Sequence, residues 1–170
     1  YALSGSDLTM LYSSGGYYQV RLTGDGLPLA GKAVSIAIGG ETYSRTTDSN
    51  GYASFQVDLA PKTYTVTASY EGASCTNTVV VQSIIKAKNV NAKKSAKSVK
   101  ITVSLKKVNG KYLKNKKVTL KFNKKTFKAK TNKKGVAKFT IKKKFYSKLT
   151  AGKKYTYQVV YGEDKVKKSI

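Results

Sequence analysis

Lysine dominates the chemistry available to this chain. Its 170 residues include 33 Lys and Arg against 8 Asp and Glu, a formal net charge of +25. Histidine is absent and Cys75 is the only cysteine. The commonest general base and metal ligand are therefore missing, and neither an intrachain disulfide nor a zinc site can form. No two acids are brought to equivalent strand ends, so we expect no enzyme activity, no metal and no cofactor.

The positive charge is concentrated in the second half. Residues 1–84 carry four basic and six acidic side chains, a net charge of −2, whereas residues 85–170 carry 29 lysines and two acids, a net charge of +27. A region this positive repels itself and attracts polyanions. A solvated face that keeps edge strands from pairing is the simpler explanation. However, this excess of lysine is more than solubility requires, and it favours a polyanion-binding role.

The lysines expected on this surface fall in turns or on the outward parity of strands. They are Lys106, Lys107, Lys116, Lys117, Lys121, Lys124, Lys125, Lys128, Lys130, Lys133, Lys134, Lys138, Lys142, Lys143 and Lys144.

The second half contains no arginine, and this absence indicates which class of polyanion it could bind. Ammonium groups act as point charges, without the bidentate fork that reads guanine. Diffuse attraction to a wall polymer or acidic glycan is therefore favoured over sequence-specific DNA binding. The aromatic residues of this half mostly fall on buried parity and form no stacking platform: Tyr112, Phe127, Phe139, Tyr155, Tyr157 and Tyr161. A nucleic-acid module stays open as nonspecific backbone binding.

Asp48-Ser49-Asn50-Gly51 begins like a calcium-binding loop. The bidentate Glu that such a loop needs six residues after the Gly is missing, because Val57 stands there. The equivalent stretch of the second half is Asn132-Lys133-Lys134-Gly135, whose ammonium groups repel a cation. We expect a hairpin turn in which Asp48 bonds local backbone amides.

A repeat sets out the elements that position these residues. Gly26–Val57 aligns without a gap on Gly110–Ile141, 84 residues later. The apolar residues persist while polar positions change to lysine, which predicts one fold occurring twice in different surroundings. The apolar pairs include Val34 and Val118, Ile36 and Leu120, Ile38 and Phe122, Ala53 and Ala137, Phe55 and Phe139, and Val57 and Ile141.

Apolar and polar residues alternate with a period of two in both halves, as in strands with one buried face. Glycine-containing turns such as Asp25-Gly26 and Asn109-Gly110 punctuate them. The pattern predicts an all-β chain of two tandem immunoglobulin-like antiparallel β-sandwich domains, end to end. Strands are expected near 7–13, 16–23, 33–39, 42–47, 52–58, 63–70 and 75–82, and near 85–90, 97–107, 116–122, 125–131, 136–142, 154–161 and 164–170.

The predicted domains are a near-neutral one over residues 1–84 and a Lys-rich one over 85–170. No Gly or Pro lies at their junction, so we expect a stiff connection. Between residues 142 and 154 the second copy carries seven extra residues, because Tyr64 aligns on Tyr155 at an offset of 91. A short helical turn that caps one end of the sandwich is expected there. The chain shows no signal peptide or transmembrane run and opens in mid-pattern, as expected of part of a longer protein.

The first half carries a recurring set of turn and strand residues: Asp7, Leu8, Met10, Tyr12, Gly26, Pro28, Leu29, Ala30, Tyr43, Arg45, Thr46, Thr47, Asp48, Asn50, Gly51, Ala53, Tyr64, Tyr70 and Gly72. With these residues it resembles the repeated Ig-like domain of the large adhesin-like surface proteins of methanogenic archaea, and the second half resembles the Lys-rich domain that often closes them. The resemblance covers almost the whole chain, although Pro61-Lys62-Thr63 replaces the family's Pro-Gly.

By this resemblance, the parent protein is extracellular, at the cell surface or cell wall. Domains of such adhesins sometimes form Lys–Asn cross-links beside a buried acid. The first half offers Asn77 but only Lys32 and Lys62, and the second offers only Glu163 and Asp164 as the acid. Cys75 is expected to be a small strand residue, with an intermolecular bridge as the alternative.

Three functions follow as hypotheses. In the first, the near-neutral domain continues a stalk, and the cationic domain associates with an anionic cell-envelope polymer or surface glycan, its own or that of another cell. In the second, the chain is a nonspecific polyanion-binding or nucleic-acid-binding module. In the third, both domains are inert spacers whose charge suits a particular surface layer.

Overall fold

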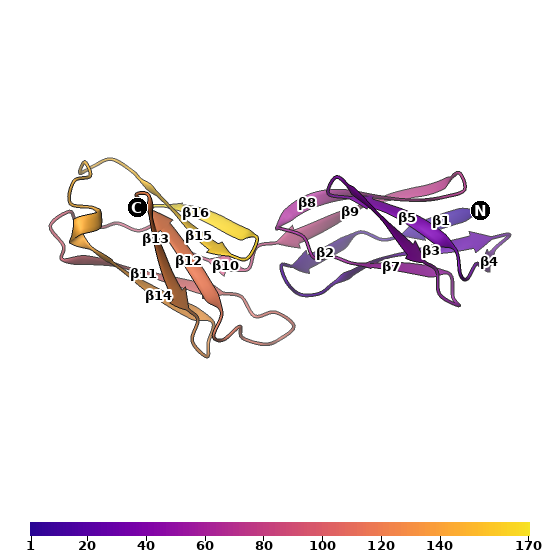
Figure 1. The fold of residues 1–170 in the computed structure, drawn as a ribbon, viewed down its shortest axis with the longest axis horizontal. Helices are drawn as coiled ribbons and strands as arrows, with labels where there is room; N and C mark the ends of the chain where they lie inside the picture. The colour runs from indigo at the N-terminus through magenta and orange to yellow at the C-terminus, as the bar shows by residue number, and fades with distance from the viewer. The chain divides into compact units, whose positions relative to one another are not determined.

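The computed structural model describes every residue from Tyr1 to Ile170 and divides the chain into two compact units (Figure 1). Unit 1 is Tyr1–Gln82 and unit 2 is Ser83–Ile170. Each unit has two β-sheets that enclose a hydrophobic core, so each is an immunoglobulin-like β-sandwich. The division falls two residues before the position expected from the sequence, because Ser83 and Ile84 hydrogen-bond to Asp164 of unit 2. No helix in the chain has the length and apolar character needed to cross a membrane.

Unit 1 consists of a four-stranded and a five-stranded sheet. In the first sheet the central strand β3 pairs with the other three, and the strands are β1 (Ala2–Gly5), β3 (Tyr17–Gly24), β4 (Leu27–Pro28) and β7 (Tyr52–Gln56). The second sheet has, in spatial order, β2 (Leu8–Leu11), β9 (Ala73–Gln82), β8 (Lys62–Tyr70), β5 (Ala33–Ile38) and β6 (Glu41–Thr46).

Unit 2 repeats this arrangement with fewer strands. Its first sheet has the order β10 (Ile85–Lys86), β11 (Ser98–Leu105) and β14 (Val136–Lys142). Its second sheet has the order β13 (Lys125–Lys130), β12 (Lys117–Phe122), β15 (Thr156–Tyr161) and β16 (Asp164–Ser169). A 3-10 helix, η1 (Lys143–Phe145), follows β14, so the short helical turn predicted in the extra residues is confirmed.

The strand registers match between the units. Ile36 pairs with Ala68 in unit 1, and Leu120 pairs with Val159 in unit 2, which reproduces the predicted offsets of 84 for β5 and 91 for β8. On the other sheet, Val20 opposite Ala53 corresponds to Val103 opposite Ala137. The same strand order therefore builds both sandwiches.

The alternation of apolar and polar residues along each strand produces the hydrophobic core of each unit. In β5, Val34, Ile36 and Ile38 are buried, whereas Ala33 and Ser35 face solvent. In β12, the corresponding Val118, Leu120 and Phe122 are buried as well. Burial of each such side chain contributes roughly 1.5–3 kcal/mol relative to exposure. The apolar face of each strand is thus held by the opposite sheet.

Three expectations about the strands were wrong. The sandwich of unit 1 is not wholly antiparallel, because β2 pairs with β9 in parallel, Leu8 beside Val79. Ala2–Gly5 forms a strand that the sequence pattern did not indicate, since its Ser and Gly residues break the apolar alternation. The strand expected at 85–90 keeps only Ile85–Lys86 on the first sheet; by Val90 the chain has crossed to the second sheet, where the Val90 amide bonds the Ser169 carbonyl.

Gly51 occupies a turn position that a side chain cannot share. Its φ is +82°, and a Cβ added there would lie 2.6 Å from the backbone oxygen of Leu22, whose amide bonds the Gly51 carbonyl. Gly135 has the same role in unit 2. Its φ is +73°, and a Cβ added to it would lie 3.1 Å from the backbone oxygen of Leu105. The turn therefore holds the end of one strand close to another.

We predict that Gly51→Ala lowers the free energy of unfolding of unit 1 by about 3 kcal/mol or more, because it combines left-handed strain with a backbone clash. Gly26→Ala is the matched control: its φ is +77°, but nothing lies within 4 Å of the added Cβ. It should cost only about 1–2 kcal/mol. Urea unfolding of the full chain measures both, and equal losses would contradict the clash.

Candidate polyanion-binding surface

The lysines of unit 2 lie on its outside. Every one of the fifteen predicted surface lysines is exposed, and of the 29 lysines in the unit only Lys168 is partly buried. They are carried by strands of both sheets and by the connecting turns. The predicted set is thus accessible to a ligand, although exposure alone does not show binding.

The second sheet of unit 2 carries its lysines at positions where unit 1 has small neutral residues. In the first strand of the β12–β13 pair, Lys117 and Lys121 replace Ala33 and Ala37, respectively. In the second, Lys128 and Lys130 replace Ser44 and Thr46. On the last strand, the offset of 91 equates Ser74 with Lys165 and Thr76 with Lys167. We call Lys117, Lys121, Lys128, Lys130, Lys165 and Lys167 the replaced set. The replaced set adds six charges without changing a core position.

Uncharged residues separate most lysines across this sheet. One row crosses four strands as Thr126, Lys121, Gln158 and Lys167, and the next as Lys128, Thr119, Val160 and Lys165. Lys117 and Lys130 are the exception, since they face each other directly. Like charges directly opposite destabilise a sheet, so this spacing limits the cost of the charge.

The first sheet of unit 2 follows the same rule. Lys100 lies opposite Thr140, Lys138 opposite Thr102, and Lys142 opposite Ser98. Lys100 and Lys138 are thus diagonal neighbours, about 7–8 Å apart. At that distance in water two unit charges repel by about 0.6 kcal/mol before screening by salt. Each outer face is therefore a spaced array of cations that a folded sheet tolerates.

The one buried acid of unit 2 has a structural partner. Asp164 is fully buried, and its carboxylate accepts hydrogen bonds from the Ser83 hydroxyl at 2.8 and 3.0 Å and from the Ile84 amide at 2.8 Å. These bonds tie the first residues of the unit to the start of β16. Asp164 therefore anchors the first residues of unit 2 to β16 and does not offset charge on the lysine surface. The sequence pattern did not indicate this role.

The Asp48 turn is built as predicted. Asp48 Oδ1 accepts bonds from the amides of Asn50 at 2.8 Å and Tyr52 at 3.0 Å. Asn132 makes the equivalent bonds to Lys134 and Val136, at 2.9 and 3.1 Å. Because a neutral amide oxygen serves as well as a carboxylate, the turn needs an acceptor and not a charge. No group of three or more His, Cys, Asp or Glu is placed to hold a metal ion.

Cys75 lies half-buried on β9, which confirms it as a strand residue. Its Sγ is 3.9 Å from the Tyr18 hydroxyl, which donates to Asn77 Oδ1 at 2.6 Å. Burial, and then the neighbouring Cys75 and Asp7, raise the pKa of Tyr18. Bonds from the Thr78 amide and then from Asn77 lower the pKa of Asp7.

The amide of Asn77 is directed at Asp7 and Gly5, at 3.2 and 3.4 Å, and not at a lysine. The two lysines of unit 1, Lys32 and Lys62, are exposed. This arrangement does not place the groups needed for a Lys–Asn cross-link in unit 1.

The aromatic residues of unit 2 divide between core and surface. Phe139 and Tyr157 are buried, Tyr157 donating a hydrogen bond to the Lys88 carbonyl. Phe127 is half-buried and packs edge-on against Phe145, with ring centres 5.2 Å apart. Tyr112 is 48% exposed, with Lys107 Nζ 4.4 Å from its ring centre.

No protein-family model matches the chain, and neither does any curated protein sequence. Among solved structures, the D0-D1 domain of intimin is 18% identical, over 99% of this chain and 95% of its own, with a TM-score of 0.38. A bacterial ice-binding adhesin is 19% identical, over 99% and 62%, with a TM-score of 0.37. A tandem of titin domains is 13% identical, over 98% and 64%, with a TM-score of 0.43. At these identities and scores the likenesses assign no ligand and no activity.

We predict that Asp164→Ala lowers the free energy of unfolding of unit 2 by about 2 kcal/mol, because the Ile84 amide loses its buried acceptor. Ser83→Ala should cost less, since the Asp164–Ile84 bond survives. Chemical denaturation of the full chain gives both values. If Ser83→Ala proves the more damaging substitution, the assignment of Asp164 as the anchor of this segment is wrong.

Proposed function

We propose that the chain is part of a non-enzymatic, adhesin-like cell-surface protein in which unit 1 serves as a stalk domain and unit 2 associates with an anionic cell-envelope polymer or surface glycan. The observation that carries this proposal is the replaced set. Between two sandwiches with the same registers, the outward positions differ by added lysines, while the buried Val34, Ile36 and Ile38 recur as apolar Val118, Leu120 and Phe122.

An extended polyanion suits these arrays better than a compact ligand does. The lysines lie on the outer faces of both sheets, spaced by Thr, Ser and Gln. No single lysine dominates such a surface, and each contact with the polymer is weak. Affinity comes from many charges that act together, with release of counterions from the polymer.

The sequence resemblance to adhesin-like surface proteins of methanogenic archaea supports an extracellular location, at the cell surface or wall. In that setting the anionic polymer belongs to the envelope of the same cell or to the surface of another. The resemblance of the first half does not depend on the lysines of the second half, and both observations favour attachment over catalysis.

Nonspecific nucleic-acid binding is the second candidate function, favoured by the net charge of +27 on unit 2. All 29 of its cations are lysines, so a guanidinium fork for base recognition is absent there. A gel shift with duplex DNA at physiological salt, beside retention on isolated envelopes, separates the two functions. Tight DNA binding without envelope retention would favour the nucleic-acid module.

We predict that retention of the full chain on an immobilised acidic polysaccharide falls at least about 100-fold between 0.1 and 0.5 M NaCl, because the Debye length shortens from about 10 Å to a few ångström. A single outward substitution such as Lys138→Gln should change the affinity less than about twofold. Retention that is insensitive to salt, or lost with this one lysine, contradicts a distributed surface. A neutral polysaccharide is the control matrix and should not retain the chain.

A further inference from the structure

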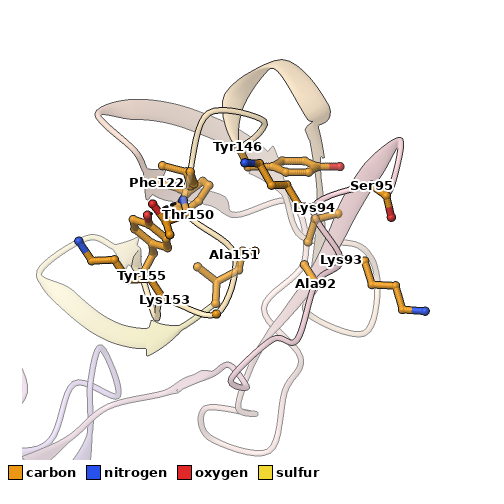
Figure 2. Close-up of a pocket in the computed structure, with 14 residues that line it drawn as sticks. Ala92, Lys93, Lys94, Ser95, Phe122, Tyr146, Thr150, Ala151, Lys153 and Tyr155 are labelled. Carbon is orange, nitrogen blue, oxygen red and sulfur yellow. Dashed lines mark hydrogen bonds between the residues drawn. The ribbon is translucent and has the colours of Figure 1, made fainter.

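The extra residues of unit 2 form one wall of a pocket. The pocket has a volume of about 340 Å³. Its walls come from the loop before β11, the end of β12, the loop between η1 and β15, and the last residue of the chain (Figure 2). Unit 1 lacks this loop, because its connection from β7 to β8 is seven residues shorter. The pocket therefore belongs to the lysine-rich copy alone.

Hydrogen bonds hold the extra loop at both ends. Tyr146 donates its hydroxyl to the Ala96 carbonyl, which fastens the loop to the opposite wall. Asn123 Nδ2 donates to the Phe145 carbonyl at 2.9 Å. At the other end the Tyr155 hydroxyl accepts from the Thr150 amide at 2.9 Å, and Tyr155 and Ile170 exchange two backbone bonds. The wall is thus fixed by its own contacts before any ligand binds.

The lining combines apolar side chains with cations. Val99, Phe122, Tyr146, Leu149 and Ile170 supply apolar surface, and Ser95 and Thr150 supply hydroxyl groups. Lys93, Lys94 and Lys153 supply positive charge, and no Asp or Glu side chain lines the pocket. The backbone oxygen of Ile170 accepts the Tyr155 amide. A ligand with an apolar face and a negative charge matches this lining.

Lys94 is the cation best placed to meet a ligand. Its side chain extends toward the wall that holds Thr150 and Tyr155, whereas the ammonium groups of Lys93 and Lys153 point outward (Figure 2). The Thr150 amide, and then the charges of Lys153 and Lys94, lower the pKa of the Tyr155 hydroxyl. The positive field of these lysines thus reaches the pocket wall.

We infer that this pocket binds one acidic sugar residue, of the hexuronate class, within the anionic polymer that the lysine faces attract. A sugar ring presents a C–H face that fits the apolar wall, hydroxyl groups for Thr150, and a carboxylate for Lys94. A fatty acid would satisfy the charge but make no use of the Thr150 hydroxyl, which is exposed and would stay bonded to water. This inference rests on the proposed function, because it names the ligand class of the same domain.

Amide NMR of the full chain, titrated with tetragalacturonate in 0.5 M NaCl, tests the inference. Salt at this concentration screens the purely electrostatic contacts to the open lysine faces, whereas binding in the pocket keeps its contribution from apolar packing and hydrogen bonds. The expected result is saturable shifts confined to the pocket wall, at Ser95, Thr150, Ala151 and Gly152. The same tetramer with its carboxylates methyl-esterified should bind at least about tenfold more weakly, since it lacks the charge that Lys94 meets.

Two variants and one competitor sharpen the test. Lys94→Gln should weaken binding at least about fivefold, whereas Lys32→Gln, the same charge change at an exposed position of unit 1, should change it less than twofold. Ala92→Phe fills the pocket without altering charge and should abolish the shifts, with an unchanged unfolding midpoint as the control for folding. Equal effects of the two lysine variants, or displacement of the tetramer by lower concentrations of decanoate, would overturn the inference.

Retention on the acidic polysaccharide at 0.1 M NaCl, measured on the same samples, keeps the two proposals apart. If the polymer is retained while shifts spread over the lysine faces and spare the pocket, the pocket assignment falls and the proposed function stands. If the tetramer fills the pocket while retention shows no salt dependence, the proposed function falls and the pocket remains an acidic-sugar site.

Discussion

The pleat of the β-strand is the constraint on which the rest of this molecule depends. Successive side chains point to opposite faces, so each strand has one face against the opposite sheet and one face in water. Packing fixes the first face: Val34, Ile36 and Ile38 recur as Val118, Leu120 and Phe122. Solvent leaves the second face free to change, and there the copies diverge. One sandwich template thus yields a near-neutral domain and a strongly cationic one.

The cationic copy also shows how a sheet accommodates many like charges. Neighbouring strands place Thr, Ser or Gln opposite most lysines, which keeps these lysines from facing another lysine directly. Their mutual repulsion is then small for each pair but adds up over the domain, and a polyanion relieves it. The attraction for a polymer and the tolerance of the fold follow from the same spacing. Asp164 stands outside this balance, since its carboxylate is buried and bonded to Ser83 and Ile84.

Much of the fold could be predicted from the sequence because the chain contains its own comparison. The offsets of 84 and 91 residues gave the registers of β12 and β15, and alternation gave the exposed lysines. The strand β1 was missed because Ser and Gly obscure its alternation, and the parallel pairing of β2 with β9 leaves no mark in a period of two. The burial of Asp164 and the pocket beside Tyr155 depend on contacts between residues far apart in sequence, such as Tyr146 with Ala96. No local pattern reports these contacts.

The most direct test of the central claim reverts the replaced set to the residues of unit 1: Lys117→Ala, Lys121→Ala, Lys128→Ser, Lys130→Thr, Lys165→Ser and Lys167→Thr. The measurement is a pair of curves on one sample, urea unfolding and binding to an acidic polysaccharide in 0.1 M NaCl. If the outer faces carry the function and the inner faces carry the fold, unit 2 unfolds at the same urea concentration or higher, while polymer affinity falls at least about tenfold. Loss of cooperative unfolding, or unchanged affinity in a stably folded variant, would contradict the separation of the two faces.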